Sequence, residues 1–193
     1  LDWHFMRGSP YLMRLMSGIG RPADTRLGRD FAGVVEAVGE AVSRFEPGDE
    51  VFGGAGGAFA EYVVVRETAA IARKPANVSF EEAASVPVAA ITALQAIRDH
   101  GQLEAGQRVL INGASGGVGT FAVQIAKTMG AEVTGVCSTR NVDMVRSIGA
   151  DHVIDYTRED FAGQGKQYDV IFDVIGKRSF ARCIRSLTSK GRY

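Results

Sequence analysis

A glycine-rich stretch from Asn112 to Gly119 is the part of the sequence best suited to hold a ligand. It contains the spacing Ala114-x-Gly116-x-x-Gly119, which is the dinucleotide fingerprint with alanine in the first glycine place. A bound phosphate needs backbone N–H donors at short range, and the N-terminus of a following helix adds a partial positive charge. The stretch therefore predicts a turn that binds a pyrophosphate. The alternative is a glycine-rich turn that holds no ligand.

The residues about 20 positions further on indicate which dinucleotide the turn would take. A site for NAD usually has Asp or Glu there to bind the ribose 2′-OH, but this sequence has Cys137, followed by Ser138, Thr139 and Arg140. Two hydroxyls and a guanidinium would donate hydrogen bonds and charge to a 2′-phosphate. We therefore expect NADPH rather than NADH. The alternative is that Arg140 only begins a solvated helix.

Alternating elements position these residues in the second half of the chain. Apolar runs, and helical segments that end at glycine, predict strands over 108–112, 132–137, 153–156 and 168–174, with helices over 117–129, 141–148 and 179–187. The last residues, Arg192 and Tyr193, are typical of a strand that is just beginning. This alternation predicts an α/β fold with a doubly wound parallel sheet, and the glycine-rich turn joins its first strand to its first helix.

The first half of the chain has a different pattern. Short alternating runs, broken by glycine and proline, predict an antiparallel β region with strands over 34–39, 46–52 and 60–65 and a turn over 47–49. A capping box at Ser79-Phe80-Glu81-Glu82 predicts a helix start, Pro87 interrupts that helix, and a second helix is expected over 88–99. We expect domains over 1–78 and 106–193, with interdomain helices over 79–105.

Composition excludes several classes of function. The 193 residues include 22 basic and 22 acidic side chains and are 46% apolar, which argues against disorder and against a broad surface for nucleic acid or membrane. No apolar run reaches the ~18 residues of a membrane span. Two cysteines, Cys137 and Cys183, form neither a zinc cluster alone nor a disulfide framework, so a reducing, cytoplasmic location is expected. Both chain ends are expected to be cut, which would leave any targeting peptide upstream of Leu1.

Several blocks in a specific order resemble the medium-chain dehydrogenases/reductases, in the zinc-independent quinone oxidoreductase branch (zeta-crystallin-like and reticulon-interacting-protein-like). The blocks are Leu1-Asp2-Trp3, Gly28-Arg29-Asp30-Phe31-Ala32-Gly33, Phe45 to Phe52, Phe59 to Val63, Gly113 to Gly119, and Gly149 to Tyr156. The resemblance implies a GroES-like catalytic domain and a Rossmann domain, both incomplete here, with the active site in the cleft between them.

The resemblance also implies roles for individual residues. Ser115, Gly117 and Val118 match pyrophosphate contacts, and Ser138 matches a 2′-phosphate contact. Further matches are Tyr156 beside the adenosine phosphate, Thr92 on the nicotinamide side, and Val174 and Ile175 beneath the nicotinamide ribose. Asp30 and Tyr62 are weak candidates for the catalytic cleft, and a hydrogen-bonding scaffold role is the favoured interpretation of Asp30.

Two positions argue against a metal site. In the zinc-dependent relatives a Gly-His-Glu block and a helical cysteine stand where this sequence has Gly28-Arg29-Asp30 and Val88. Neither arginine nor valine ligates zinc, so no metal is expected.

The expected reaction is hydride transfer from NADPH to an acceptor that stabilises the resulting charge by conjugation. The expected substrate is a small quinone or α,β-unsaturated carbonyl, with no nucleic acid or membrane partner and a homodimer as the candidate assembly. Two alternatives remain: an enoyl-thioester reductase of the same fold, and a non-catalytic NADPH-binding sensor or structural protein.

Overall fold

The computed structural model describes residues 7, 25–163, 167–176 and 180–193. The Leu1-Asp2-Trp3 block and the predicted helix start at Ser179 lie outside the described residues. Internal contacts divide the chain into two compact units, Leu1–Val88 and Ala89–Tyr193. Each unit is described by itself.

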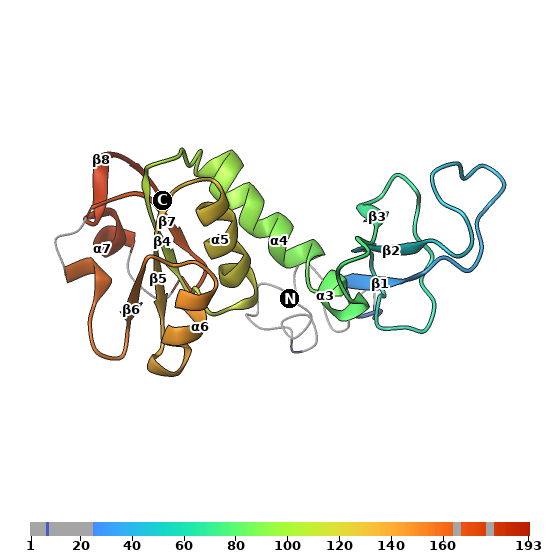
Figure 1. Cartoon of the computed structure of the whole chain (residues 1–193), viewed down its shortest axis with the longest axis horizontal. Helices are drawn as coiled ribbons and strands as arrows, with labels where there is room; N and C mark the ends of the chain where they lie inside the picture. Colours follow the sequence, from blue (N-terminus) through green and yellow to red (C-terminus); the bar gives the residue numbers. More distant parts are fainter. Residues whose placement is uncertain (1–6, 8–24, 164–166, 177–179) are drawn as a thin grey trace. The chain divides into compact units, whose positions relative to one another are not determined.

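The first unit contains a small antiparallel sheet (Figure 1). Its order is β1-β2-β3, with β1 at Asp30–Val34, β2 at Glu50–Gly54 and β3 at Ile71–Arg73. The turn predicted over 47–49 is present. The N–H of Asp49 donates to the carbonyl of Glu46 at 3.1 Å and closes the turn, and the N–H of Gly48 donates across to the carbonyl of Val35. Gly48 has a φ of 96°, which glycine adopts without strain.

A short helix, α3 (Phe80–Ala84), packs on β1 and begins at the predicted capping box. The N–H of Glu82 donates to Ser79 Oγ at 3.1 Å, and the N–H of Ser79 donates to Glu82 Oε2 at 2.8 Å. Two donors that the helix start would otherwise leave unpaired are therefore satisfied.

The strand predictions in this unit were only partly right. The predicted strand over 34–39 overlaps β1 at Val34 alone, and β2 begins only at Glu50 because the turn at Pro47 and Gly48 occupies the preceding positions. The run over 60–65 is not a strand. Tyr62 is 72% exposed and Val64 is fully exposed, and no strand among the described residues pairs with this run. Alternating apolar and polar residues do not form a strand unless a neighbouring strand is available to pair with them.

The second unit is a five-stranded sheet in which every neighbouring pair is parallel (Figure 1). The strand order is β6-β5-β4-β7-β8. The strands are β4 (Arg108–Asn112), β5 (Glu132–Cys137), β6 (His152–Asp155), β7 (Tyr168–Asp173) and β8 (Leu187–Arg192). The first helix, α4 (Pro87–Leu94), starts at the end of the first unit and continues as the π-helix η1 (Gln95–His100). The other α-helices are α5 (Gly117–Thr128), α6 (Val142–Ser147) and α7 (Phe180–Ile184). Two short 3-10 helices are η2 (Thr139–Asn141) and η3 (Phe161–Gly163).

Both faces of this sheet are buried. Val109 and Ile111 of β4 belong to a core that also contains Ala122 and Val123 of α5, whereas Leu110 of β4 lies in a second core with Phe161. Because successive residues of a strand point to opposite faces, the apolar run over 108–112 fills both cores. The doubly wound parallel sheet predicted from the sequence is confirmed.

Most predicted elements of the second unit match the structure, and α5 and α6 end next to Gly130 and Gly149, whose φ angles are positive. The helix predicted over 179–187 was wrong at its end. That helix stops at Ile184, and Leu187 already pairs with Tyr168 in the edge strand β8. The strand thought to begin at Arg192 therefore ends there. Its sequence has no clear alternation of polar and apolar residues, so the local pattern carried little information.

Candidate functional site

The glycine-rich turn lies where the direction of the sheet connections reverses. From β4 the chain passes through α5 to β5 on one side, whereas β7 pairs with β4 on the other side. Ligands of doubly wound sheets bind at such a switch point, outside the carboxyl ends of the strands. The N–H groups of Gly113 and Ala114 donate to the carbonyl of Val136, at 3.1 and 3.0 Å, and thereby attach the turn to β5.

Space around the turn explains its glycines. Gly113 has a φ of 89°, so the left-handed residue lies one position before Ala114. Ala114, which stands in the first glycine place of the fingerprint, is fully buried. Its backbone does not have a positive φ, so alanine is accommodated at this position. A Cβ on Gly119 would overlap the carbonyl oxygen of Gly113, whereas a Cβ on Gly116 would lie 3.3 Å from that oxygen. Glycine at 119 thus lets α5 lie against the turn, and the exposed Gly116 leaves its outer side open.

The first turn of α5 offers three free donors. The N–H groups of Gly117, Val118 and Gly119 have no hydrogen-bond acceptor in the described part of the chain, and the N-cap residue Gly116 provides no side chain to cap them. Aligned peptide dipoles give this end of the helix a partial positive charge. The arrangement fits a pyrophosphate, because a glycine-rich turn leaves room for a phosphate and the positive end of the helix presents unpaired donors.

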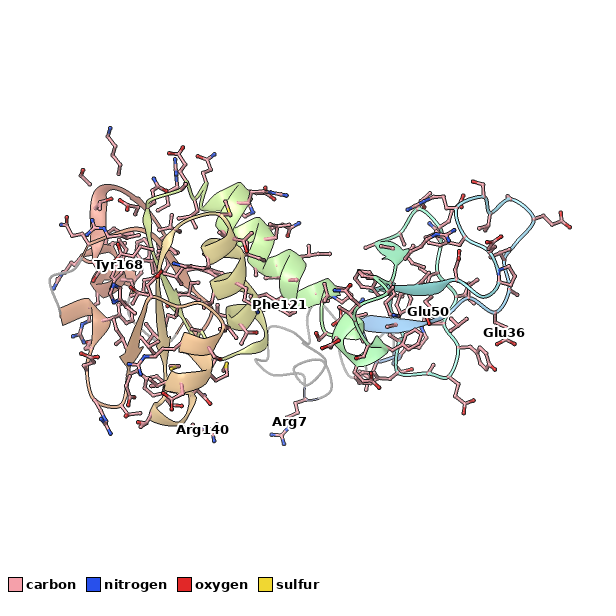
Figure 2. The ribbon with its side chains drawn as sticks, in the orientation of Figure 1. Arg7, Glu36, Glu50, Phe121, Arg140 and Tyr168 are labelled. Atoms are coloured by element: carbon pink, nitrogen blue, oxygen red, sulfur yellow. The ribbon has the colours of Figure 1, made fainter. Side chains whose placement is uncertain are left out.

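The end of β5 carries the residues predicted to select the coenzyme. Ser138 is the N-cap of η2, and Arg140 is exposed, with its side chain projecting from the surface in Figure 2. Thr139 is already engaged, because its hydroxyl donates to Asp155 Oδ2. This hydrogen bond is the main reason that the pKa of Asp155 is lowered, with a further contribution from the N–H of Thr157. A largely buried carboxylate thus lies beside the predicted 2′-phosphate position, with its oxygens already accepting hydrogen bonds.

A hydrogen-bonded loop after β7 meets the same edge. Asp173 Oδ1 accepts from Asn112 Nδ2 and from the N–H groups of Ile175 and Gly176, all at 2.9 Å. The N–H of Val174 donates to the carbonyl of Asn112. Burial works to raise the pKa of Asp173, but the hydrogen bonds from Gly176, Ile175, Asn112 and Tyr193 together outweigh it, so the pKa is lowered.

The side chain of Ile175 lies against Gly113, since a Cβ there would come within 2.8 Å of its Cδ1. Two predicted site residues, Val174 and Ile175, therefore lie next to the glycine-rich turn. Tyr156 also reaches this edge, because its N–H donates to the carbonyl of Cys137 at 3.0 Å.

Three predicted residues lie elsewhere. Thr92 is exposed on α4, and Tyr62 is exposed in the first unit. Asp30 Oδ1 accepts a 2.8 Å hydrogen bond from the N–H of Val88 near the start of α4, which supports the scaffold interpretation of Asp30. The catalytic roles of Asp30 and Tyr62 and the nicotinamide contact of Thr92 stay predictions.

Four polar residues of the site were missed by sequence reasoning: Asn112, Asn141, Asp155 and Asp173. Asn112, Asp155 and Asp173 are each the last residue of a buried strand, so a search for polar residues at strand ends would have found them. Asn141 gave no local signal, because its contact with Ser115 joins residues that are 26 positions apart.

No group of three or more His, Cys, Asp or Glu side chains that could hold a metal ion occurs within the described ranges. In the same part of the chain, no helix is long and apolar enough to cross a bilayer.

Comparisons with known proteins agree with this two-part architecture. The family model for the alcohol dehydrogenase GroES-like domain matches residues 1–76, and the model for zinc-binding dehydrogenase matches residues 117–193. The mitochondrial NAD(P)H oxidoreductase RTN4IP1 of Mus musculus is 45% identical over 78% of this chain and 40% of its own length.

Two solved structures are also similar. The quinone oxidoreductase from Coxiella burnetii has a TM-score of 0.86 and 34% identity, covering 98% of this chain and 60% of its own. The CurK enoyl reductase has a TM-score of 0.85 and 30% identity, covering 99% of this chain and 60% of its own.

These similarities define a class of proteins with a GroES-like domain followed by a Rossmann-type sheet. The chain belongs to this class, the medium-chain dehydrogenase/reductase superfamily. Within the superfamily it falls in the quinone oxidoreductase branch that includes the RTN4IP1-like proteins. The chain spans about half the length of the relatives it matches.

Proposed function

We propose that this protein is an NADPH-dependent, zinc-independent reductase that transfers hydride to a quinone or an α,β-unsaturated carbonyl. The observation that carries the proposal is the set of free N–H groups at Gly117, Val118 and Gly119, which face the open side of a glycine cradle at the sheet's switch point.

Each part of the sheet edge has a role in holding the coenzyme. The amides of the first turn of α5 bind the pyrophosphate, and Ser138 and Arg140 bind the 2′-phosphate through a hydroxyl and a guanidinium. Asp173 fixes the loop at Val174 and Ile175. This loop would contact the nicotinamide ribose of the bound coenzyme. When bound, NADPH supplies the hydride and the protein supplies position and exclusion of water.

The choice of acceptor follows from two residues of the first unit. Arg29 and Val88 stand where zinc-dependent relatives place ligands, and neither side chain binds zinc. An acceptor must then carry the developing charge itself, as conjugated quinones and enones do. The similarity to the quinone oxidoreductase of Coxiella burnetii supports this acceptor class.

An enoyl-thioester reductase is the second candidate, because the CurK enoyl reductase resembles the chain almost as well as the quinone oxidoreductase does. Both candidates use the same coenzyme site and differ in the acceptor. A binding protein without turnover would use that site as well.

Stopped-flow oxidation of NADPH distinguishes these possibilities. The full-length protein is mixed with NADPH and then with a panel of quinones, enones and enoyl-coenzyme A thioesters, and NADH is run in parallel. The proposal expects rapid oxidation by quinones or enones and a preference for NADPH. Oxidation by thioesters alone supports the second candidate. Tight NADPH binding without oxidation by any acceptor overturns the proposal and identifies a sensor.

A further inference from the structure

Asn141 connects two segments of the coenzyme site that are far apart in sequence. It is the last residue of η2, and its side-chain nitrogen Nδ2 donates to Ser115 Oγ at 3.0 Å and to Ser138 Oγ at 3.3 Å. Ser115 belongs to the glycine-rich turn and Ser138 follows β5. One amide group therefore joins the predicted pyrophosphate contact to the predicted 2′-phosphate contact.

The direction of these hydrogen bonds determines what the serines can offer a ligand. An amide nitrogen carries two protons and no acceptor, so it gives one proton to each hydroxyl oxygen. Each serine then keeps its own O–H proton for another partner, and no acceptor for either proton occurs among the described residues. A donated hydrogen bond also polarises the hydroxyl and makes it a better donor.

Thr139 provides a contrast within the same short segment. Its hydroxyl donates to the carboxylate of Asp155, so its proton is already used. Of the three hydroxyls near the site, only the two bonded to Asn141 have protons available for an anion. The amide of Asn141 thus distinguishes ligand-binding hydroxyls from a structural one.

We infer that Asn141 is a positioning residue that directs the hydroxyl protons of Ser115 and Ser138 toward the phosphates of the coenzyme and thereby favours the 2′-phosphorylated form. The inference rests on the proposed coenzyme site. It assigns a determinant of specificity to a neutral side chain that neither fingerprint nor charge pattern indicates.

Replacement of Asn141 by aspartate reverses the direction of the hydrogen bonds. In Asn141→Asp, the carboxylate accepts from both serines, uses their protons and adds negative charge. In Asn141→Ala the orientation is lost without added charge. Gln124→Glu, at an exposed position of α5, is a matched control for a neutral-to-acidic change elsewhere.

Calorimetric titration of each full chain with 2′,5′-ADP, NADPH and NADH tests the inference. We expect Asn141→Asp to weaken 2′,5′-ADP and NADPH binding about tenfold or more, equivalent to about 1.4 kcal/mol. For Asn141→Ala we expect a loss of roughly threefold, within the usual worth of one hydrogen bond. NADH retains only the pyrophosphate contact and should lose less, while Gln124→Glu should match the wild type.

The remaining outcomes separate the two proposals. Unchanged binding of 2′,5′-ADP by Asn141→Ala, whatever Asn141→Asp does, overturns the inference, because any loss would then come from charge repulsion. Equal losses for NADPH and NADH also overturn it. Failure of the wild-type chain to bind any of the three ligands counts against the proposed coenzyme site itself.

Discussion

Polar side chains at the strand ends, which are not part of the glycine fingerprint, also shape this site. Asn112 and Asp173 are polar residues at the ends of two buried, neighbouring strands, and their side chains bond to each other at 2.9 Å. Asp173 also fixes the backbone of Ile175 and Gly176. The glycines of the fingerprint leave space for a phosphate, whereas Asn112 and Asp173 hold the loop after β7 next to the glycine-rich turn.

Sequence could predict the residues that local chemistry requires and not those defined by distant contacts. The glycines follow from the spacing of one strand–turn–helix segment, and Ser138 and Arg140 follow from their distance beyond it, at the end of the next strand. By contrast, the link between Thr139 and Asp155 depends on the register of β5 with β6, in which Cys137 lies beside Asp155. A carboxylate beside the predicted 2′-phosphate position was therefore not foreseen.

Arg140→Ala tests the predicted 2′-phosphate contact. The guanidinium is exposed and should form charge-assisted hydrogen bonds with a 2′-phosphate, which are worth about 1.5–3 kcal/mol. We expect NADPH binding to weaken roughly tenfold or more, with NADH binding changed less than about twofold. Calorimetric titration with both coenzymes measures the difference.

Arg98→Ala provides the control for this variant, because Arg98 is an exposed arginine of η1 that forms an ion pair with Asp99. It should bind both coenzymes like the wild type. If Arg140→Ala weakens NADPH and NADH equally, Arg140 does not contact a 2′-phosphate.

At the scale of elements, prediction succeeded where one segment determines its own structure. The strand over 108–112, the helix that starts at Gly117 and the strand over 132–137 all matched, because buried apolar runs and glycine-ended helices are local signals. It failed over 60–65 and at β8, where strand formation depends on a partner distant in sequence.

Two glycines of the β4–α5 connection should respond differently to alanine. In Gly119→Ala, the new Cβ would overlap the backbone oxygen of Gly113, so we expect a loss of about 1–3 kcal/mol in unfolding free energy together with lost coenzyme binding. Gly116 has φ and ψ of −84° and 168°, which alanine adopts readily. Gly116→Ala should change stability by less than about 1 kcal/mol and still weaken coenzyme binding.

Urea denaturation and NADPH titration of both variants measure these two effects. Gly117→Ala is the matched control for stability, because no atom lies within 4 Å of its added Cβ. Normal coenzyme affinity in Gly116→Ala would contradict the close approach of a pyrophosphate to this turn.

At the scale of the whole molecule, the two units differ in how much apolar surface they bury. Among the described residues, the apolar side chains that the first unit buries are Val51, Ala83 and Pro87, whereas most of the core belongs to the second unit. The first unit also has an open groove of about 700 Å³, whose lining includes Val34, Tyr62 and Val64. Because apolar burial is the main stabilising contribution to folding, the second unit should be the more stable one.

Calorimetry of this chain should therefore show two unfolding transitions, with the second unit unfolding at the higher temperature. NADPH binds only to that unit in the proposed site, so at a concentration 100-fold above its Kd it should stabilise that unit by about 2.7 kcal/mol. For a domain of this size the upper transition should rise by roughly 10 °C or more, while the lower one stays in place. A single transition that shifts as a whole would mean that the two units unfold together. A shift of the lower transition alone would mean that the coenzyme binds the first unit, which contradicts the proposed site.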